Sequence, residues 1–118
     1  MGTTRINGVS YFSEAVKETM VGDELELVHD AENKYDPNAM KVINKRLNLQ
    51  IGFVPKEFNN PRTGQKDAFS AEVKRKISGG RQYSAKIIQI LGGTPEKPSL
   101  GLKMNIGWES TPQGPRNA

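Results

Sequence analysis

The sequence predicts a mainly β fold, an OB-like β-barrel with one main inserted helix and short helical turns. Five or six short apolar runs follow one another at regular spacing through the 118 residues, separated by turn-forming residues. One longer helical pattern stands before the last two runs. An α+β sandwich is the alternative. We expect a single domain over residues 1–108 and a flexible C-terminal tail, 109–118, of proline, glycine and polar residues.

The first part of the chain predicts two strands with a short helix between them. Residues 6–12 are expected to form the first strand, with Gly8 where the backbone bends. Apolar residues at roughly helical spacing indicate one or two helical turns over residues 13–20, and residues 21–23 form a turn. Alternating leucines and polar residues over 25–29 are typical of a half-buried strand.

The middle of the chain predicts a β-hairpin followed by a helical turn. Residues 40–43 and 49–54 are expected to form its two strands, and residues 44–48 turn between them. Pro55 cannot donate to a sheet ladder and is favoured early in a helix, so residues 55–58 are expected to form a first helical turn.

The main helix is expected to begin at Asp67, whose side chain can cap it, and to continue through Ile77. Phe69, Val73 and Ile77 recur every four residues and mark its buried face. Residues 59–65, which precede the helix, form a polar loop.

Two strands complete the predicted fold, after a glycine pair at 79–80 that ends the helix. The first strand covers residues 83–91. One of its faces comprises Tyr83, Ala85, Ile87 and Gln89. Residues 92–98 form a turn. The final strand covers residues 100–106, where large apolar side chains alternate strictly with other residues.

Composition excludes several kinds of active site. The chain has no cysteine, which excludes disulfides and thiolate metal sites, and its one histidine, His29, lies in a predicted strand. It contains neither a Gly-x-x-x-x-Gly-Lys loop nor a Gly-x-Ser-x-Gly motif. We therefore expect no enzymatic activity, no cofactor and no bound metal. Asp30, Glu32 and Asp36 leave a metal-dependent nuclease as an alternative, although they lack the spacing of a calcium loop.

The sequence also indicates a protein that does not enter membranes. No apolar stretch approaches the roughly 18 residues of a membrane span, and the start of the chain lacks an apolar signal region. The expected location is the cytoplasm, with the nucleoid in a bacterium or the nucleus in a eukaryote.

The charge is distributed unevenly, a pattern that can indicate a polyanionic partner. Residues 1–36 carry three basic and eight acidic residues, a net charge of −5, whereas residues 37–118 carry fourteen and five, a net charge of +9. The later basic residues include Lys74, Arg75, Lys76, Arg81 and Lys86. On charge alone, however, a merely solvated lysine-rich surface is favoured. Because aromatic residues also stand near loops and strand starts, where bases can stack on them, a nucleic-acid partner is better supported than catalysis.

Residues 33–40 hold the most unusual combination of side chains, in which Tyr35 and Asp36 stand side by side in a polar segment. A carboxylate repels phosphate, so Asp36 suits a ligand that offers a hydroxyl, such as a sugar hydroxyl at a strand end. Spacing alone favours another explanation, an Asx-turn in which Asp36 or Asn33 binds its own backbone.

The chain resembles the HIRAN domain family. The resemblance lies in Val-Gly-Asp-Glu-Leu-Glu-Leu at 21–27, Asn-Lys-Tyr-Asp-Pro-Asn-Ala-Met-Lys-Val at 33–42, Gln-Ile-Gly-Phe-Val-Pro-Lys-Glu at 50–57 and a first strand near 8–11. It covers roughly residues 5–92. The family implies an OB-like barrel, found fused to Swi/Snf-type helicases and also as short stand-alone proteins. In helicase-linked members it holds the 3′ end of single-stranded DNA.

The resemblance implies a role for each matching residue. Tyr11 would be a stacking ring on the first strand, and Asn33 would shape or line the pocket. Tyr35 would contact the terminal nucleotide, while Asp36 would accept a hydrogen bond from the 3′-hydroxyl. Lys56 would meet a backbone phosphate.

Tyr83 would stack on a base, and the basic residues Lys74, Arg75 and Arg81 add further candidate contacts. Ser10 departs from the family, because helicase-linked members carry arginine there. We therefore expect a module that binds single-stranded DNA or DNA 3′ ends in repair or replication, with a helicase or nuclease encoded separately. The alternative is a protein-interaction adaptor that has lost the end pocket.

Overall fold

Antiparallel strands dominate the computed structural model, which describes residues 2–59 and 62–109. One sheet has the order β1-β8-β7 and comprises β1 (Gly2–Arg5), β8 (Leu100–Trp108) and β7 (Tyr83–Gly92). The other has the order β2-β3-β4 and comprises β2 (Leu25–His29), β3 (Met40–Asn44) and β4 (Leu49–Phe53). A separate hairpin comprises β5 (Glu57–Asn59) and β6 (Lys66–Ala68). The helices are η1 (Val9–Phe12), α1 (Ser13–Glu18) and α2 (Ser70–Ser78).

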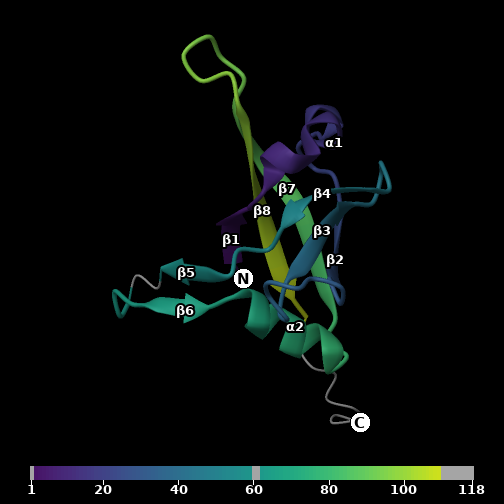
Figure 1. The fold of residues 1–118 in the computed structure, drawn as a ribbon, viewed down its shortest axis with the longest axis vertical. Helices are drawn as coiled ribbons and strands as arrows, with labels where there is room; N and C mark the ends of the chain where they lie inside the picture. The colour runs from purple at the N-terminus through teal and green to yellow at the C-terminus, as the bar shows by residue number, and fades with distance from the viewer. Residues whose placement is uncertain (1, 60–61, 110–118) are drawn as a thin grey trace.

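The predicted mainly β class with one main helix is confirmed (Figure 1). The two sheets are joined at each side by an isolated bridge. Asn7 and Phe53 exchange backbone hydrogen bonds of 2.9 and 2.8 Å, and Glu24 bridges to Lys86 in β7. The two three-stranded sheets are therefore linked by isolated bridges, and among the described strands no continuous ladder closes them into a barrel.

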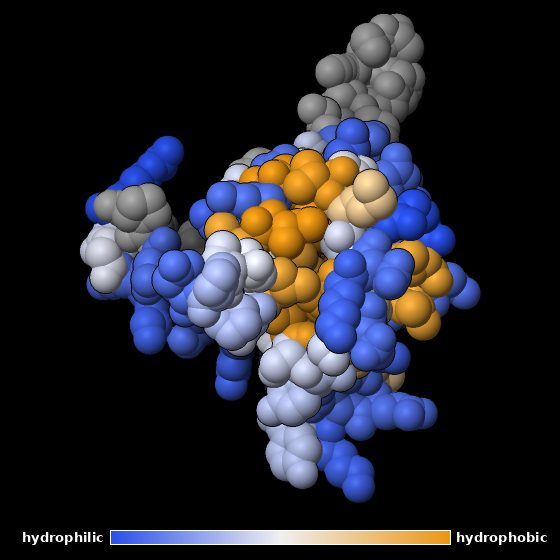
Figure 2. All heavy atoms as spheres, turned by 90° about the horizontal axis from the view of Figure 1, so that it is seen from above, coloured by the Kyte–Doolittle hydropathy of each residue, from blue (hydrophilic) through white to orange (hydrophobic). Residues whose placement is uncertain are grey.

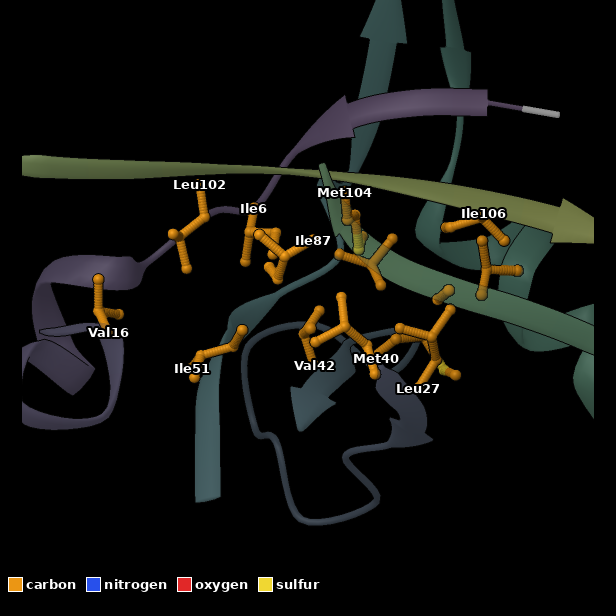
Figure 3. Close-up of a cluster of buried hydrophobic side chains, with 14 of the residues drawn as sticks. Ile6, Val16, Leu27, Met40, Val42, Ile51, Ile87, Leu102, Met104 and Ile106 are labelled. Carbon is orange, nitrogen blue, oxygen red and sulfur yellow. The ribbon is translucent and has the colours of Figure 1, made fainter. Parts of the chain in front are cut away.

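The hydrophobic core lies between the two sheets (Figure 3). Ile87, Leu102, Met104 and Ile106 point from β7 and β8 toward Leu27, Met40, Val42 and Ile51 of the other sheet. This pattern follows from the strict alternation of β8, whose apolar positions all face the same side. Seen from the end that carries α1 and the β7–β8 turn, hydrophobic side chains gather centrally and hydrophilic ones surround them (Figure 2).

The predicted first strand is wrong in position. The strand is β1, which ends at Arg5, whereas residues 9–12 form the 3-10 helix η1. Gly8 precedes η1 with φ of +71°, a left-handed conformation that glycine adopts without cost, and it turns the chain out of the sheet. Tyr11 therefore stands on a helical turn, with its N–H bonded to the Gly8 carbonyl at 3.0 Å.

The predicted elements from residue 13 to residue 53 are confirmed. α1 follows η1 directly, and β2, β3 and β4 form the expected strand and hairpin. Register shifts between Val42 and Ile43, where β3 and β4 contain an irregularity. The apolar pattern therefore predicts which residues form the hairpin strands, but it does not predict the irregular pairing at this position.

The helical turn predicted at residues 55–58 is wrong. Residues from Glu57 pair instead with β6, in the register Glu57 to Ala68 and Asn59 to Lys66. Asp67 lies in β6 and does not cap a helix; α2 begins at Ser70, and no side chain caps its start. Strand pairing thus outweighs the weak helical preference of a proline-led segment.

The buried face predicted for the main helix is confirmed, since Val73 is buried and Phe69 and Ile77 pack against the core. In β7, however, a register shift between Ile87 and Gln89 changes the predicted face. Ile90 packs against the core, and Gln89 is exposed. A bulge adds one residue and so reverses the alternation that follows it.

Two further expectations from the sequence concern membrane spans and the C-terminal tail. No helix within residues 2–59 and 62–109 is long and apolar enough to cross a membrane. The expected tail, 109–118, lies outside the described residues apart from Glu109.

A buried carboxylate joins the elements around the second sheet. Asp23 is 8% exposed and receives hydrogen bonds from Arg46 Nε at 2.8 Å, Asn44 Nδ2 at 2.9 Å and the Met20 N–H at 2.8 Å. Thr19 completes the cluster by accepting from Asn44 Nδ2 at 3.2 Å. These bonds hold the end of α1, the start of β2 and the β3–β4 turn together. The hydrogen bond from Arg46 holds the pKa of Asp23 well below its usual value of 3.8.

We expect Asp23→Asn to lower the free energy of unfolding by roughly 1–3 kcal/mol at pH 7, because a charge-assisted hydrogen-bond acceptor is lost from a buried site. Urea denaturation would measure this loss. Since folding lowers the Asp23 pKa, its contribution is complete above pH 3.8 and is lost as the pH falls toward the folded-state pKa. The difference between wild type and variant should therefore shrink below pH 4.

Glu24→Gln is the matched control. The Glu24 side chain is exposed, and its Oε1 forms only a long surface ion pair with Lys45 Nζ, at 3.8 Å. We expect it to change stability by less than about 0.5 kcal/mol. A difference between wild type and Asp23→Asn that stays constant from pH 7 to pH 3 would contradict the linkage.

Candidate nucleic-acid interface

The loop between β2 and β3 is built around two side chains that bind its own backbone. The Asp30 N–H donates to the Ala39 carbonyl at 2.8 Å and closes the base of the loop. Asn33 Oδ1 accepts from the N–H groups of Tyr35 and Asp36, both at 2.9 Å. Asp36 Oδ1 accepts from the Asn38 N–H at 2.9 Å. The Asx-turn interpretation is confirmed for both residues.

This turn presents the aromatic ring and the acid that the sequence singles out. The Tyr35 side chain is 94% exposed, so no other part of the described chain packs on its ring. Asp36 is half-buried, and its Oδ1 is engaged by the turn. Within the described residues, no donor reaches Asp36 Oδ2. The turn therefore leaves one carboxylate oxygen to accept a hydrogen bond from a ligand.

Side chains from β2 and α2 support the loop. His29 Nε2 lies 2.8 Å from the Pro37 carbonyl and donates to it in the tautomer that carries the proton there. Lys74 Nζ, from α2, donates to the same carbonyl at 3.4 Å and to Asn38 Oδ1 at 3.5 Å. The structure thus brings Lys74 against the loop at Pro37 and Asn38, where α2 runs next to the loop (Figure 1).

Tyr11 and Lys56 lie on either side of the Asn7–Phe53 bridge. A Cβ atom added to Gly8 would lie 3.3 Å from the Phe53 ring and 3.6 Å from the Tyr11 ring, so Tyr11 stands close to the end of β4. Lys56 follows Phe53 by three residues and is exposed, as Tyr11 is at 82%. The bridge is antiparallel, so the chain leads from it to Tyr11 and to Lys56 in opposite directions.

Backbone contacts connect the segment that carries Lys56 to the loop. The Val54 N–H donates to the Met40 carbonyl at 2.9 Å, directly after the loop ends. The Phe69 N–H donates to the Lys56 carbonyl at 2.9 Å, just before α2 begins. Consequently the segment 53–56 lies between the start of η1, the end of the loop and the start of α2.

Tyr83, Arg75 and Arg81 occupy a different setting. The Leu27 N–H donates to the Tyr83 hydroxyl at 2.9 Å, and the Tyr83 ring lies 5.7 Å from the Trp108 ring. Burial raises the pKa of the Tyr83 phenol, despite the opposing bond from Leu27. Tyr83 therefore helps to join β7 to β2, and its stacking on a base stays a prediction.

The two arginines already have protein partners. Arg75 donates to Glu72 Oε1 at 2.6 Å on the exposed face of α2, which lowers the pKa of the Glu72 carboxyl. Arg81 Nε donates to the Glu109 carbonyl at 3.0 Å. Lys76 Nζ lies 4.9 Å from the centre of the Trp108 ring. This region is basic, but its cations are tied to neighbouring groups.

Sequence reasoning missed Asn7, Asn59 and Lys66, which line a cavity together with Lys56 and Glu57. These residues lie on or near the two three-residue strands that flank the Thr63-Gly64 turn. The sequence offers little signal for these strands, because short exposed strands carry little apolar periodicity. Among the described residues, no group of three or more histidine, aspartate or glutamate side chains is arranged to hold a metal ion.

Fold and site together define a small, mainly β binding domain of the OB-like type. The family model of the HIRAN domain matches residues 1–89, and the chain belongs to that family of DNA-binding domains. A comparison with curated protein sequences finds no match.

Two solved structures are similar in fold. The crystal structure of the HIRAN domain of human HLTF is 18% identical, with a TM-score of 0.53, over 98% of this chain and 81% of that one. A protein from Lactobacillus plantarum is 16% identical, with a TM-score of 0.58, over 91% of this chain and 93% of that one. Both matches extend past residue 89, so the fold they share includes part of the β7–β8 hairpin.

We expect Asn33→Ala to loosen the loop, because two backbone N–H groups lose their acceptor. Amide hydrogen exchange of Tyr35 and Asp36 should accelerate by about tenfold, while the free energy of unfolding falls by only about 1 kcal/mol. Asn33→Asp keeps the acceptor oxygen and is the control. Equal exchange rates in Asn33→Ala and wild type would show that other contacts hold the turn.

Proposed function

We propose that this chain binds single-stranded DNA at its 3′-hydroxyl end and has no catalytic role of its own. The observation that carries the proposal is the turn of residues 33–38. It holds an exposed tyrosine ring beside a carboxylate of which one oxygen is engaged and the other is open. The family relationship supports the same class of ligand.

Each group at the site has a distinct part in this proposal. The Tyr35 ring stacks on the terminal nucleotide, where an aromatic–base contact contributes about 1–3 kcal/mol. Asp36 Oδ2 accepts the hydrogen bond that the terminal 3′-hydroxyl donates. Tyr11 stacks on a base further along the strand, and Lys56 neutralises a backbone phosphate. Asn33 keeps the turn in place.

The acid makes the site selective for the kind of strand end. Two like charges about 4 Å apart repel by about 4 kcal/mol at an effective dielectric constant of about 20, less where salt screens them. A 3′-phosphate beside Asp36 therefore loses the hydroxyl's hydrogen bond and gains a repulsion. The site is consequently an end reader and not a general polyanion surface.

The basic residues supply affinity that does not depend on the end. Lys74 stands beside the loop, and Arg75, Arg81 and Tyr83 extend the surface toward the start of β7. Such contacts release counterions, so binding weakens as salt rises. A helicase or nuclease carried on a separate polypeptide, acting in DNA repair or replication, is the enzyme that would use the bound end.

A protein-interaction adaptor is the second candidate function. Two observations favour it: Ser10 stands where helicase-linked members have arginine, and a sizeable groove elsewhere on the described surface is mostly apolar. The groove has a volume of about 620 Å³ and lies between β1, β8 and α2, with Phe69 and Trp108 in its lining. An adaptor would keep its partner after the end-binding residues are changed, whereas a DNA binder would lose affinity.

The end-recognition proposal is tested by titrating labelled oligonucleotides that end in either a 3′-hydroxyl or a 3′-phosphate. We expect wild type to bind the hydroxyl end more tightly by about tenfold, equivalent to about 1.4 kcal/mol. Asp36→Asn keeps an oxygen that can accept from the Asn38 N–H but removes the charge, so the preference should fall to about twofold or less. Fluorescence anisotropy at low salt is the measurement.

Glu32→Gln is the matched control, because it removes one charge from the same loop at an exposed position. It should keep the full preference. Equal affinity of wild type for both ends would remove end recognition, and absence of binding to either at low salt would remove the DNA-binding proposal.

We expect Ser10→Arg to strengthen binding to DNA with a 3′-hydroxyl. Ser10 is exposed on η1 next to Tyr11, so arginine fits without disturbing the core and adds a cation near the bound strand. The dissociation constant should fall by about threefold to tenfold, with a steeper salt dependence. Ser10→Gln, which is polar but neutral, should leave the salt dependence unchanged; an equal gain in both variants would contradict a charge effect.

A further inference from the structure

The β5–β6 hairpin carries a polar cavity at its base. The hairpin projects from the body of the molecule, to the side of β1 (Figure 1). The cavity has a volume of about 360 Å³ and is lined by Asn7, Lys56, Glu57, Asn59 and Lys66. This is more than ten times the ~30 Å³ that a water molecule occupies in the liquid, so a hydrated phosphodiester fits.

Strand pairing explains why these side chains share one face. Asn59 lies directly opposite Lys66, and Glu57 lies two residues before Asn59, so all three project to the same side of the hairpin. Lys56 immediately precedes the hairpin. Asn7 reaches the cavity because its bridge to Phe53 places it beside this segment.

The cavity has the donors that a phosphate requires. Lys56 and Lys66 are exposed, and within the described residues neither forms an ion pair with a carboxylate within 4.0 Å. Two ammonium groups against the single carboxylate of Glu57 leave a net charge of +1. The side-chain amides of Asn7 and Asn59 add neutral donors, which is a suitable set for a singly charged phosphodiester.

The cavity also continues the surface proposed for the strand end. Lys56 belongs to both, and its carbonyl accepts from the Phe69 N–H next to α2, while Asn7 leads directly into Gly8 and η1. A strand whose 3′ end lies at Tyr35 and Asp36 would pass Lys56 and then reach the hairpin.

We propose that Lys66, with Asn7 and Asn59, forms a further phosphate subsite that holds the single strand on the 5′ side of the nucleotides bound at the 3′-end site. This inference rests on the proposed function, because it places the strand by its 3′ end. Lys66 acts as a phosphate ligand and does not read bases. The hairpin therefore lengthens the bound segment and adds to affinity without adding sequence preference.

The proposal is tested with oligothymidylates of two to ten nucleotides that end in a 3′-hydroxyl. Dissociation constants of wild type and Lys66→Ala are measured by fluorescence anisotropy at several salt concentrations. We expect equal affinity for the dinucleotide and about threefold to tenfold weaker binding of the variant to the longest strand. The slope of log affinity against log salt for that strand should fall by about 0.7, the value for one phosphate of a single strand.

Two control variants make the result specific. Lys97→Ala removes another exposed cation, from the β7–β8 turn at the far end of the molecule, and should change neither the affinity nor the slope (Figure 1). Lys66→Arg keeps the charge and should restore binding of the long strand. Circular dichroism shows whether each variant is folded.

The outcomes separate this inference from the proposed function. If Lys66→Ala binds every length as wild type does while the preference for a 3′-hydroxyl persists, the subsite is overturned and end recognition stands. If Lys66→Ala and Lys97→Ala weaken long strands equally, Lys66 contributes only general charge and the subsite is overturned. If wild type binds none of the strands at low salt, both proposals fail.

Discussion

The contact between the start of the second sheet and the first sheet depends on Asp23. Its buried carboxylate binds Arg46 and Asn44 of the β3–β4 hairpin, while its carbonyl accepts from the Ile87 N–H in β7 at 3.0 Å. Asp23 therefore helps to join the second sheet to the first and to fix where β2 begins. Because β2 and β3 pair in register from Leu25 to His29, this starting point also sets where the candidate loop leaves the sheet. A charge buried in this way is costly unless it is paired, so the cluster favours a single arrangement.

The candidate site combines a locally built turn with a position set by distant contacts. Asn33 and Asp36 shape the turn through bonds to residues at most three positions away, so the turn needs little help from the fold. Its placement depends on Lys74 of α2 and on His29. A rigid turn on a rigid support is what recognition of a strand end requires, because a hydroxyl is distinguished from a phosphate only where the carboxylate stays in place.

Particular residues show how far sequence reasoning reached. The pattern of leucines and isoleucines predicted β2, β3, β4, β7 and β8, because alternation reports burial directly. It failed at Gly8, where a left-handed residue changes a strand into a 3-10 turn, and at residues 57–68, where exposed strands lack an apolar pattern. It also failed after Ile87, since a bulge leaves no mark in composition. At the site, the sequence showed that Tyr35 and Asp36 are adjacent. It did not show that Lys66 lines a cavity together with Asn7 and Lys56.

The sequence by itself determined the mainly β class, the core face of β8 and of β7 up to its bulge, and the polar turn that carries Tyr35 and Asp36. These features depend on the spacing of apolar and turn-forming residues along the chain, which can be read from the sequence directly. The tertiary structure alone decided that Asn7 pairs with Phe53, that Lys74 supports the loop, and that the Tyr83 hydroxyl joins β7 to β2. These contacts join residues far apart in sequence. They exist because the two sheets must pack face to face to bury one apolar core, and this packing brings distant segments of the chain together.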